Sequence, residues 1–209
     1  DTLALAGEAM PAAHRESALA LRDQAMHLSG VVGNLLDLAR ISAGGMRPRK
    51  EWQPLEEVVG SAIKLLEHAL AAYRVEVDLP ADLPLLEFDS VLLERVFGNL
   101  LDNAARQAPA GSTIRVSARL LEDGVEACVR DAGPGFPKDL DLSEPFTRGA
   151  RELASGGVGL GLSICKAILA AHGGELRLDN PSDGGARACF SLPLGTPPTL
   201  IPEDSEPAS

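Results

Sequence analysis

The longest regular repeat of apolar and polar positions predicts an amphipathic helix over Asp89–Ala108. Its apolar side chains recur at the helical period and form one stripe: Leu92, Leu93, Val96, Phe97, Leu100, Leu101 and Ala104. Asp89 is placed to cap the N-terminus of this helix, and Pro109 with Gly111 ends it. One face of the helix is therefore suited to burial, and the rest of the chain is expected to be organised around it.

A polar stripe runs along one edge of the same helix and carries Asn99, Asn103 and Arg106. Polar stripes are usually solvated faces. Asn, however, is a poor residue for a helix interior, because its side chain competes for backbone hydrogen bonds. Two Asn residues one turn apart therefore suggest a function beyond solubility.

Upstream, the pattern predicts two helices joined by a turn. The second helix carries apolar residues at steps that alternate between three and four, which is the seam of a helical bundle: Leu21, Ala25, Leu28, Val32, Leu35 and Ala39. Thr2–Met10 looks like the end of the first helix, with Pro11 at the turn, and Gly44 with Gly45 ends the second. A two-helix hairpin cannot bury such a seam alone, so a partner copy that completes a four-helix bundle is expected.

Downstream, helices alternate with strands, and tight hairpins join several of the strands. The predicted helices cover Pro54–Leu70 and Gly157 to about Ala171, and the predicted strands cover Tyr73–Leu79, Leu85–Phe88, Ile114–Leu120, Val125–Arg130, Glu175–Asp179 and Ala186–Leu192. This order favours an α+β sandwich, a mostly antiparallel sheet with helices on one face. Lys138–Gly156 has no steady period and is expected to be a functional loop or disordered, and no order is expected beyond Gly195.

Composition narrows the classes of function. The 209 residues are 45% hydrophobic but only 3% aromatic, so Leu, Val and Ala must fill the core. A net charge of −11 argues against an extended nucleic-acid surface, which needs a basic face. No apolar run approaches a membrane span and no signal peptide is recognisable, so no membrane contact is expected for this chain. Cys128, Cys165 and Cys189 form no CxxC pair, and we expect three buried thiols in a reducing cytosol.

Three stretches carry candidate chemistry. The Asn residues offer amide oxygens, which suit a hard cation such as magnesium. Gly157–Gly161 opens a helix, where backbone N–H groups can approach a phosphate. Asp131 ends a strand and is followed by glycines, so its carboxylate can accept a hydrogen bond from a ligand amine while a flat ring lies on bare backbone.

Each of these signals alone is weak. The glycine run also fits a tight turn, and Asp131 also fits a residue that starts a turn. The run is not a GxGxxG that follows a strand, nor a GxxxxGK[ST], which excludes the dinucleotide-binding fold and the P-loop.

The order of four motifs is more specific. NLLDNA, DAGPG, EPFTRG and GGVGLGLSI resemble the N, G1, F and G2 boxes of the histidine-kinase ATP-binding domain, in the GHKL superfamily, and the resemblance covers about Leu55–Leu194. NLLDLARISAGG resembles the second helix of that family's dimerisation domain, and KEWQPLEEVVGSAIKLLE resembles the potassium-responsive sensor kinases. The resemblance implies a two-layer α/β sandwich preceded by a partial helical dimerisation hairpin. The expected layout is a hairpin at 1–46, a catalytic domain at 47–194 and a disordered tail at 195–209.

The resemblance also implies roles for single residues. Asn103 matches the magnesium-binding Asn, with Asn99 as its partner one turn earlier, and Arg106 falls where a phosphate-contacting Lys or Arg is usual. These three are the implied catalytic residues, and ATP and Mg²⁺ are the implied ligands. Asp131 matches the Asp that recognises the adenine amino group. The other implied nucleotide-binding residues fall in three groups. Gly133 and Gly135 lie around adenine, Phe146 and Arg148 lie at the edge of the lid (the loop Lys138–Gly156), and Gly157, Gly159, Leu160 and Gly161 lie around the triphosphate.

Two features depart from the family pattern. Gln107 stands where many members have an aromatic residue near the nucleotide. The phosphoacceptor box, a His followed by an acidic residue and soon by Pro, is absent, because His14, His27, His68 and His172 all lack that context. We therefore expect the chain to begin just after such a box, and we expect His14 and His27 to face solvent.

The resemblance implies the catalytic part of a two-component sensor histidine kinase. The intact enzyme would transfer the γ-phosphoryl group of ATP to its own His and then to an Asp of a response regulator receiver domain. It would be a homodimer through the hairpin, and this chain would be the cytoplasmic portion of a protein anchored in the bacterial inner membrane. Two alternatives stay open. An ATP-hydrolysing chaperone or mismatch-repair relative is disfavoured, because Asn99 stands where those proteins use a Glu to activate water. The other alternative is a nucleotide-sensing interaction module without chemistry of its own.

Overall fold

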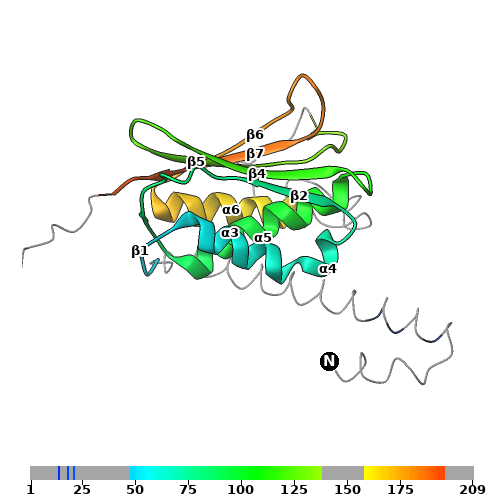
Figure 1. Cartoon of the computed structure of the whole chain (residues 1–209), viewed down its shortest axis with the longest axis horizontal. Coiled ribbons are helices and arrows are strands. Elements are labelled where there is room, and N and C mark those ends of the chain that lie inside the picture. Colours follow the sequence, from blue (N-terminus) through cyan, green and yellow to red (C-terminus); the bar gives the residue numbers. More distant parts are fainter. Residues whose placement is uncertain (1–13, 15–17, 19–20, 22–47, 138–157, 196–209) are drawn as a thin grey trace, which may run out of the picture. The chain divides into compact units, whose positions relative to one another are not determined.

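The computed structural model describes His14, Ala18, Leu21, residues 48–137 and residues 158–195 (Figure 1). The chain divides into two compact units, residues 1–46 with 142–164 and residues 47–141 with 165–209. In the first unit, His14 is helical and exposed, as the sequence predicted for its side chain. The rest of the predicted hairpin with His27, the segment Lys138–Gly156 and the tail beyond Gly195 lie outside the described residues.

The second unit contains a five-stranded sheet in the order β2-β4-β5-β7-β6. Its strands are β2 Arg74–Asp78, β4 Thr113–Leu120, β5 Gly124–Arg130, β6 Leu176–Asp179 and β7 Arg187–Pro193. Neighbouring strands pair antiparallel, except that β2 runs parallel to β4. A helix between β2 and β4 supplies the crossover that a parallel pair requires. The predicted, mostly antiparallel sheet is confirmed, with one parallel pair at its edge.

The helices of the described ranges are α3 Leu55–Leu65, α4 Glu67–Leu70, α5 Ser90–Gln107 and α6 Val158–His172. Figure 1 shows α3, α5 and the C-terminal part of α6 on one side of the main sheet, which confirms the predicted sandwich. The single helix predicted over Pro54–Leu70 is interrupted, because Leu66 has φ −102° and ψ 17° and so leaves the helical region. Within the described ranges, no helix is both long and apolar enough to cross a membrane.

Helix α5 has the caps and the burial that its sequence predicted. The Asp89 carboxylate accepts a hydrogen bond from the Leu92 N–H at 3.1 Å and caps the N-terminus. The buried residues of the helix are members of the apolar stripe: Leu93, Val96, Phe97, Leu100, Leu101 and Ala104. The ring of Phe97 meets that of Phe190 on β7 edge-on, with the two centroids 5.2 Å apart. This contact joins α5 to the sheet.

A second, two-stranded sheet lies outside the main one. It pairs β1 (Glu51–Gln53) antiparallel with β3 (Leu86–Phe88). The strand predicted over Leu85–Phe88 therefore exists but does not join the main sheet, and β1 was not predicted. A strand of three residues is too short to show a period of two, so the sequence carries little signal for it.

Two of the three Cys residues differ from the prediction. Cys128 on β5 and Cys189 on β7 face each other in the antiparallel ladder, their Cα atoms are 4.0 Å apart, and their sulfurs form a disulfide. The prediction of three free thiols was wrong for this pair, because strand pairing brings together residues separated by 61 positions. Cys165 is a free and buried Cys, as predicted.

His172, the last residue of α6, is buried where the start of the domain meets the N-terminal end of α5. Its side chain is only 1% exposed. Nε2 accepts a hydrogen bond from the Asp89 N–H at 3.1 Å, and Nδ1 lies 2.8 Å from the Ile168 carbonyl oxygen. These partners assign a neutral imidazole with its proton on Nδ1. The Lys50 ammonium donates to the His172 carbonyl at 3.3 Å, which ties the segment before β1 to the same point.

We expect His172 to make folding stability depend on pH. Burial lowers the pKa of His172 below its ordinary value, which is about 6.5. The unfolded chain therefore takes up the proton first, so the stability is fully present above about pH 6.5 and is lost as the pH falls below that value. Urea unfolding at about pH 8 and about pH 5.5 should show a larger loss of unfolding free energy in wild type than in His172→Gln. His68→Gln, at an exposed His, should keep the wild-type loss. Equal losses in wild type and His172→Gln would contradict this role.

Candidate active site

The polar edge of α5 presents the first group of predicted site residues. Asn99 and Asn103 are half-buried one turn apart, between the buried apolar stripe and solvent. Arg106 lies one turn further on, and its Nε donates to the Asp102 carboxylate at 2.9 Å. Both side chains of this ion pair are more than a third exposed, and such pairs contribute little to stability.

Asn99 carries one of the few buried polar atoms in the described part of the chain that lack a partner. Its Nδ2 is buried and makes no hydrogen bond there. The amide faces the thiol of Cys165, which itself donates to the Val96 carbonyl at 3.7 Å. Burial raises the pKa of the Cys165 thiol to about 12, so this group stays neutral. The sulfur of Cys165 is thus the neighbour of this amide, whose contact with it acts against the rise in pKa that burial causes.

Asp131 lies directly after β5 and is held by hydrogen bonds to two different segments. Its N–H donates to the Ala186 carbonyl at 3.0 Å, and its Oδ1 accepts from the Gly133 N–H at 2.7 Å. The residue is 6% exposed. Burial raises the pKa of the Asp131 carboxyl, and the hydrogen bond from Gly133 acts in the opposite direction. A carboxylate can accept several further hydrogen bonds, so Asp131 keeps capacity for a ligand.

The turn after Asp131 packs on the C-terminal end of α5. A Cβ atom at Gly133 would lie 2.8 Å from the Asp131 Oδ1 and 2.8 Å from the Gln107 carbonyl oxygen, so there is no room for a side chain. Asp131 and Gly133 therefore lie one turn beyond Asn103 along the same helix. The structure thus brings the turn that carries Asp131 and Gly133 to the end of the helix that carries Asn99 and Asn103.

Two residues that hold this turn were missed by the sequence analysis. Asn180, after β6, accepts from the Phe136 N–H at 2.7 Å and donates to the Phe136 carbonyl at 2.8 Å. Gly135 has φ 87°, and a Cβ atom there would lie 2.9 Å from the Asn180 side-chain oxygen. Gly185 has φ 84°, and a Cβ atom there would overlap the Asp131 carbonyl oxygen. The sequence placed Gly185 between two predicted strands, but nothing in it identified Asp131 as the partner of this glycine.

The remaining predicted residues are described in part. Gly159, Leu160 and Gly161 lie at the start of α6, which begins at Val158. The predicted glycine-rich start of a helix is therefore present, with these glycines inside the helix. Phe146, Arg148 and Gly157 lie outside the described residues.

Comparison with known proteins places this geometry in a family. Residues 88–196 match the family described as "Histidine kinase-, DNA gyrase B-, and HSP90-like ATPase". Sensor protein KdpD of Escherichia coli (strain K12) is 42% identical over 201 residues, which are 95% of this chain and 22% of that protein. KdpD of Clostridium acetobutylicum is 34% identical over 78% of this chain and 19% of that protein. The chain thus spans about a fifth of the length of these relatives.

Solved structures agree with the sequence relatives. Acinetobacter baumannii histidine kinase AdeS is 25% identical with a TM-score of 0.70, covering 90% of this chain and 87% of that chain. Full-length ShkA, solved in complex with AMPPNP, is 25% identical with a TM-score of 0.72, covering 90% of this chain and 40% of that chain. The matched family region contains α5, Asp131 and α6. The chain therefore belongs to the histidine kinase-, DNA gyrase B- and HSP90-like ATPase family, and over most of its length it is similar to KdpD sensor proteins.

Proposed function

We propose that the domain binds ATP with Mg²⁺ along the polar edge of α5, with adenine at the Asp131 turn. The observation that carries the proposal is the packing of Gly133 against the Gln107 carbonyl. It sets a buried carboxylate one turn away from Asn103, on the same helix edge. Adenine needs an acceptor for its exocyclic amine, which the Asp131 carboxylate would provide. The phosphates need hydrogen-bond donors and a cation, for which Arg106 and the amide oxygen of Asn103 are the proposed donor and metal ligand.

Asn103 is proposed to hold the metal, with Asn99 beside it. The amide oxygen of Asn is a suitable ligand for Mg²⁺, which prefers oxygen and binds few protein groups when it also binds phosphates. Asn99 is half-buried one turn before Asn103 on the same edge of the helix. When bound, Mg²⁺ would neutralise charge on the phosphates. Arg106 would bind a phosphate in place of the exposed Asp102 carboxylate, to which its Nε donates.

The remaining phosphate contacts are proposed from the family resemblance. The start of α6, with Gly159, Leu160 and Gly161, offers backbone N–H groups at the positive end of a helix. Gly157 would extend this run, and Phe146 with Arg148 would form the edge of the lid.

For the whole protein we propose histidine kinase activity. Residues 1–46 would be part of a dimerisation hairpin, 47–194 the catalytic domain and 195–209 a tail. The γ-phosphoryl group would pass to a His of the intact protein and then to a response regulator, and the intact protein would be a dimer anchored in the inner membrane. A nucleotide-binding module or an ATPase is the second candidate, although Asn99 offers no base for water. Acid-labile phosphate on the intact protein after incubation with γ-labelled ATP separates the two.

Loss of the Asn103 amide should remove the effect of magnesium on ATP binding. Asn103→Ala deletes an oxygen ligand, and we expect ATP affinity in the presence of magnesium to fall about tenfold, the size of a lost contact of about 1.4 kcal/mol. Titration calorimetry with and without magnesium measures this. Glu57→Ala, at an exposed position on α3, is the control and should behave as wild type. An equal magnesium effect in Asn103→Ala and wild type would refute the assignment.

Adenine should be preferred over guanine because of Asp131. Guanine carries a carbonyl where adenine carries its amine, so the buried Asp131 carboxylate would face an acceptor. A mismatch of this kind costs on the order of 1–3 kcal/mol. ATP should therefore bind more tightly than GTP, and Asp131→Asn, whose amide can donate, should narrow the difference. Competition between the two nucleotides measures the ratio, and similar affinities in wild type would rule out this role.

The Gly185 contact gives a test with a matched control. Gly184 and Gly185 both have positive φ, 96° and 84°, but a Cβ atom at Gly184 meets nothing within 4 Å whereas one at Gly185 overlaps the Asp131 carbonyl. Ala at either position carries similar backbone strain. We expect Gly185→Ala to displace Asp131 and weaken ATP binding well beyond Gly184→Ala, by about tenfold or more. Equal affinities in the two variants would show that the turn does not position Asp131.

A further inference from the structure

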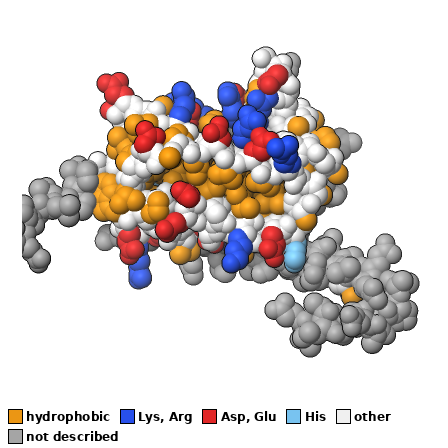
Figure 2. Space-filling view, in the orientation of Figure 1, with side chains coloured by type: hydrophobic (Ala, Val, Ile, Leu, Met, Phe, Trp, Pro, Cys, Tyr) orange, Lys and Arg blue, Asp and Glu red, His pale blue; other side chains and the backbone are white. Residues whose placement is uncertain are grey.

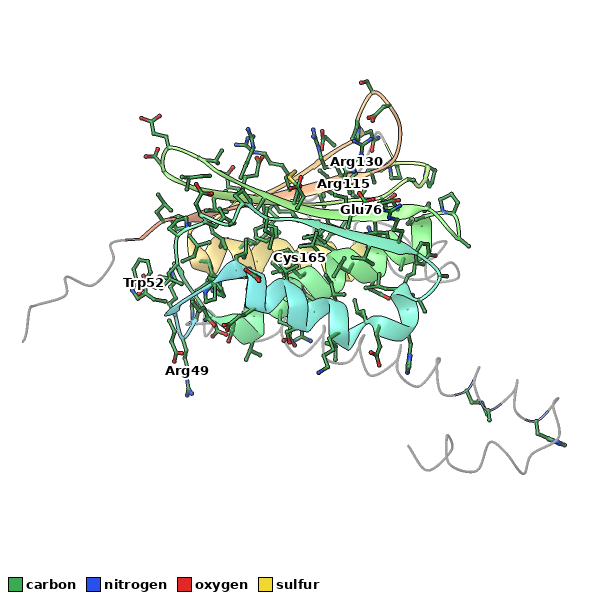
Figure 3. The ribbon with its side chains drawn as sticks, in the orientation of Figure 1. Arg49, Trp52, Glu76, Arg115, Arg130 and Cys165 are labelled. Carbon is green, nitrogen blue, oxygen red and sulfur yellow. A yellow bond between two sulfur atoms is a disulfide. The ribbon has the colours of Figure 1, made fainter. Side chains whose placement is uncertain are left out.

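The face of the main sheet opposite the helices carries charged side chains and the Cys128–Cys189 disulfide. Strand alternation buries Ala127 and Val129 toward the helices and turns Cys128 away from them. One row of register partners crosses all strands of this face: Glu76, Arg115, Arg130, Arg187 and Asp179. Figure 3 shows Glu76 and Arg115 close together, with Arg130 near them. The next row is Asp78, Ser117, Cys128, Cys189 and Arg177.

The charges of this face are paired, and Figure 2 shows acidic and basic side chains interspersed over the sheet. The ion pairs nearest the disulfide are Arg115–Glu76, Arg130–Asp183, Arg187–Asp179 and Arg119–Glu126. Glu126 and the two sulfurs lie within 4.8 Å of one another, but the sulfurs are bonded to each other and the Glu126 carboxylate is bound to Arg119. We therefore assign no metal to this cluster. Cys128 is half-buried and Cys189 is 8% exposed, so solvent reaches the bond mainly at Cys128.

The disulfide joins the two strands that hold Asp131. Beyond the Cys128–Cys189 pair the ladder continues through Val129–Ala188 and Arg130–Arg187. It ends where the Asp131 N–H donates to the Ala186 carbonyl and where Gly185 packs against the Asp131 carbonyl. A covalent link three residues before Asp131 therefore restrains the end of the ladder that positions the carboxylate. Without it, this end of the ladder is held by non-covalent contacts alone, and such ends open locally more easily than a cross-linked one.

We propose that Cys128–Cys189 is a site of thiol–disulfide exchange with low-molecular-weight thiols, and that its oxidised form holds Asp131 in place and strengthens nucleotide binding. A small thiolate attacks the Cys128 sulfur and forms a mixed disulfide there. The S–S bond breaks, and Cys189 leaves as a thiolate that takes up a proton. A second small thiolate then attacks the small-thiol sulfur of the mixed disulfide. Cys128 leaves as a thiolate and takes up a proton. The protein disulfide gains two electrons and two protons, and two small thiols are oxidised to one small disulfide.

The effect on nucleotide follows from linkage. If the cross-link favours the arrangement that binds nucleotide, nucleotide must favour the oxidised form by the same factor. Allosteric couplings of this type are typically about fivefold or more. The exchange site rests on the structure alone, whereas the effect on affinity rests on the proposed binding of adenine by Asp131.

The experiment uses native protein in magnesium-containing buffers with different ratios of reduced to oxidised small thiol. Titration of free thiols and mass measurement report the state of the pair. Hydrogen exchange over residues 125–133 reports the end of β5 and needs no nucleotide. Titration with ATP reports affinity. The variants are Cys128→Ser, which cannot form the bond, and Ser117→Ala, which changes the neighbour of Cys128 on β4 but keeps the bond.

On reduction we expect two thiols to appear together and hydrogen exchange over residues 125–133 to become faster. We also expect ATP affinity to fall about fivefold or more. Cys128→Ser should match reduced wild type in every buffer, and Ser117→Ala should respond as wild type does. If Cys128→Ser does not fold, reduced and oxidised wild type still provide the comparison. A bond that small thiols do not open, or that opens without any change in hydrogen exchange, would overturn the inference. If reduction changes hydrogen exchange but ATP binds in neither state, the proposed nucleotide site is refuted, whereas the proposed site of thiol–disulfide exchange is supported.

Discussion

The packing of α5 against the main sheet is the interaction on which the site depends. Successive residues of a helix differ by about 100° in direction, so burial of one face fixes the direction of every other side chain. Phe97 against Phe190, with the neighbouring apolar stripe, fixes that face. Each large apolar side chain buried this way contributes about 1.5–3 kcal/mol, so rotation of α5 is strongly opposed. Asn99 and Asn103 are therefore positioned by apolar residues rather than by polar partners of their own.

The features that could be predicted from the sequence are those with a long period or a fixed order. Helix α5 and strands β4 and β5 repeat their pattern over seven residues or more, and the four motifs occur in one characteristic order. The break at Leu66 and the short β1 escaped prediction because neither carries enough residues to show a period. Figure 3 places Trp52 of β1 away from Arg115 and Arg130 of the charged face of the sheet.

Another class of features could not be predicted because each needs a partner far along the chain. The Cys128–Cys189 bond depends on the register of β5 with β7. No sequence pattern marked Asn180, and its two hydrogen bonds to Phe136 exist only because β6 and β7 return the chain to the turn after β5. A positive φ explains Gly185 as a turn residue, but its contact with Asp131 is a tertiary requirement. Local chemistry marks such positions, and only the fold supplies their partners.

Asp131 shows why these distant partners matter for function. A carboxylate that must find its orientation when a ligand arrives loses conformational freedom at that moment, whereas one already held loses little. Here β5 fixes the residue from one side, the Ala186 carbonyl from a second, and Gly133 with the end of α5 from a third. Gly133 also donates to one carboxylate oxygen, so the direction of the group is set as well as its position. Asp131, the residue proposed to recognise adenine, is thus oriented by the strand ladder and by α5.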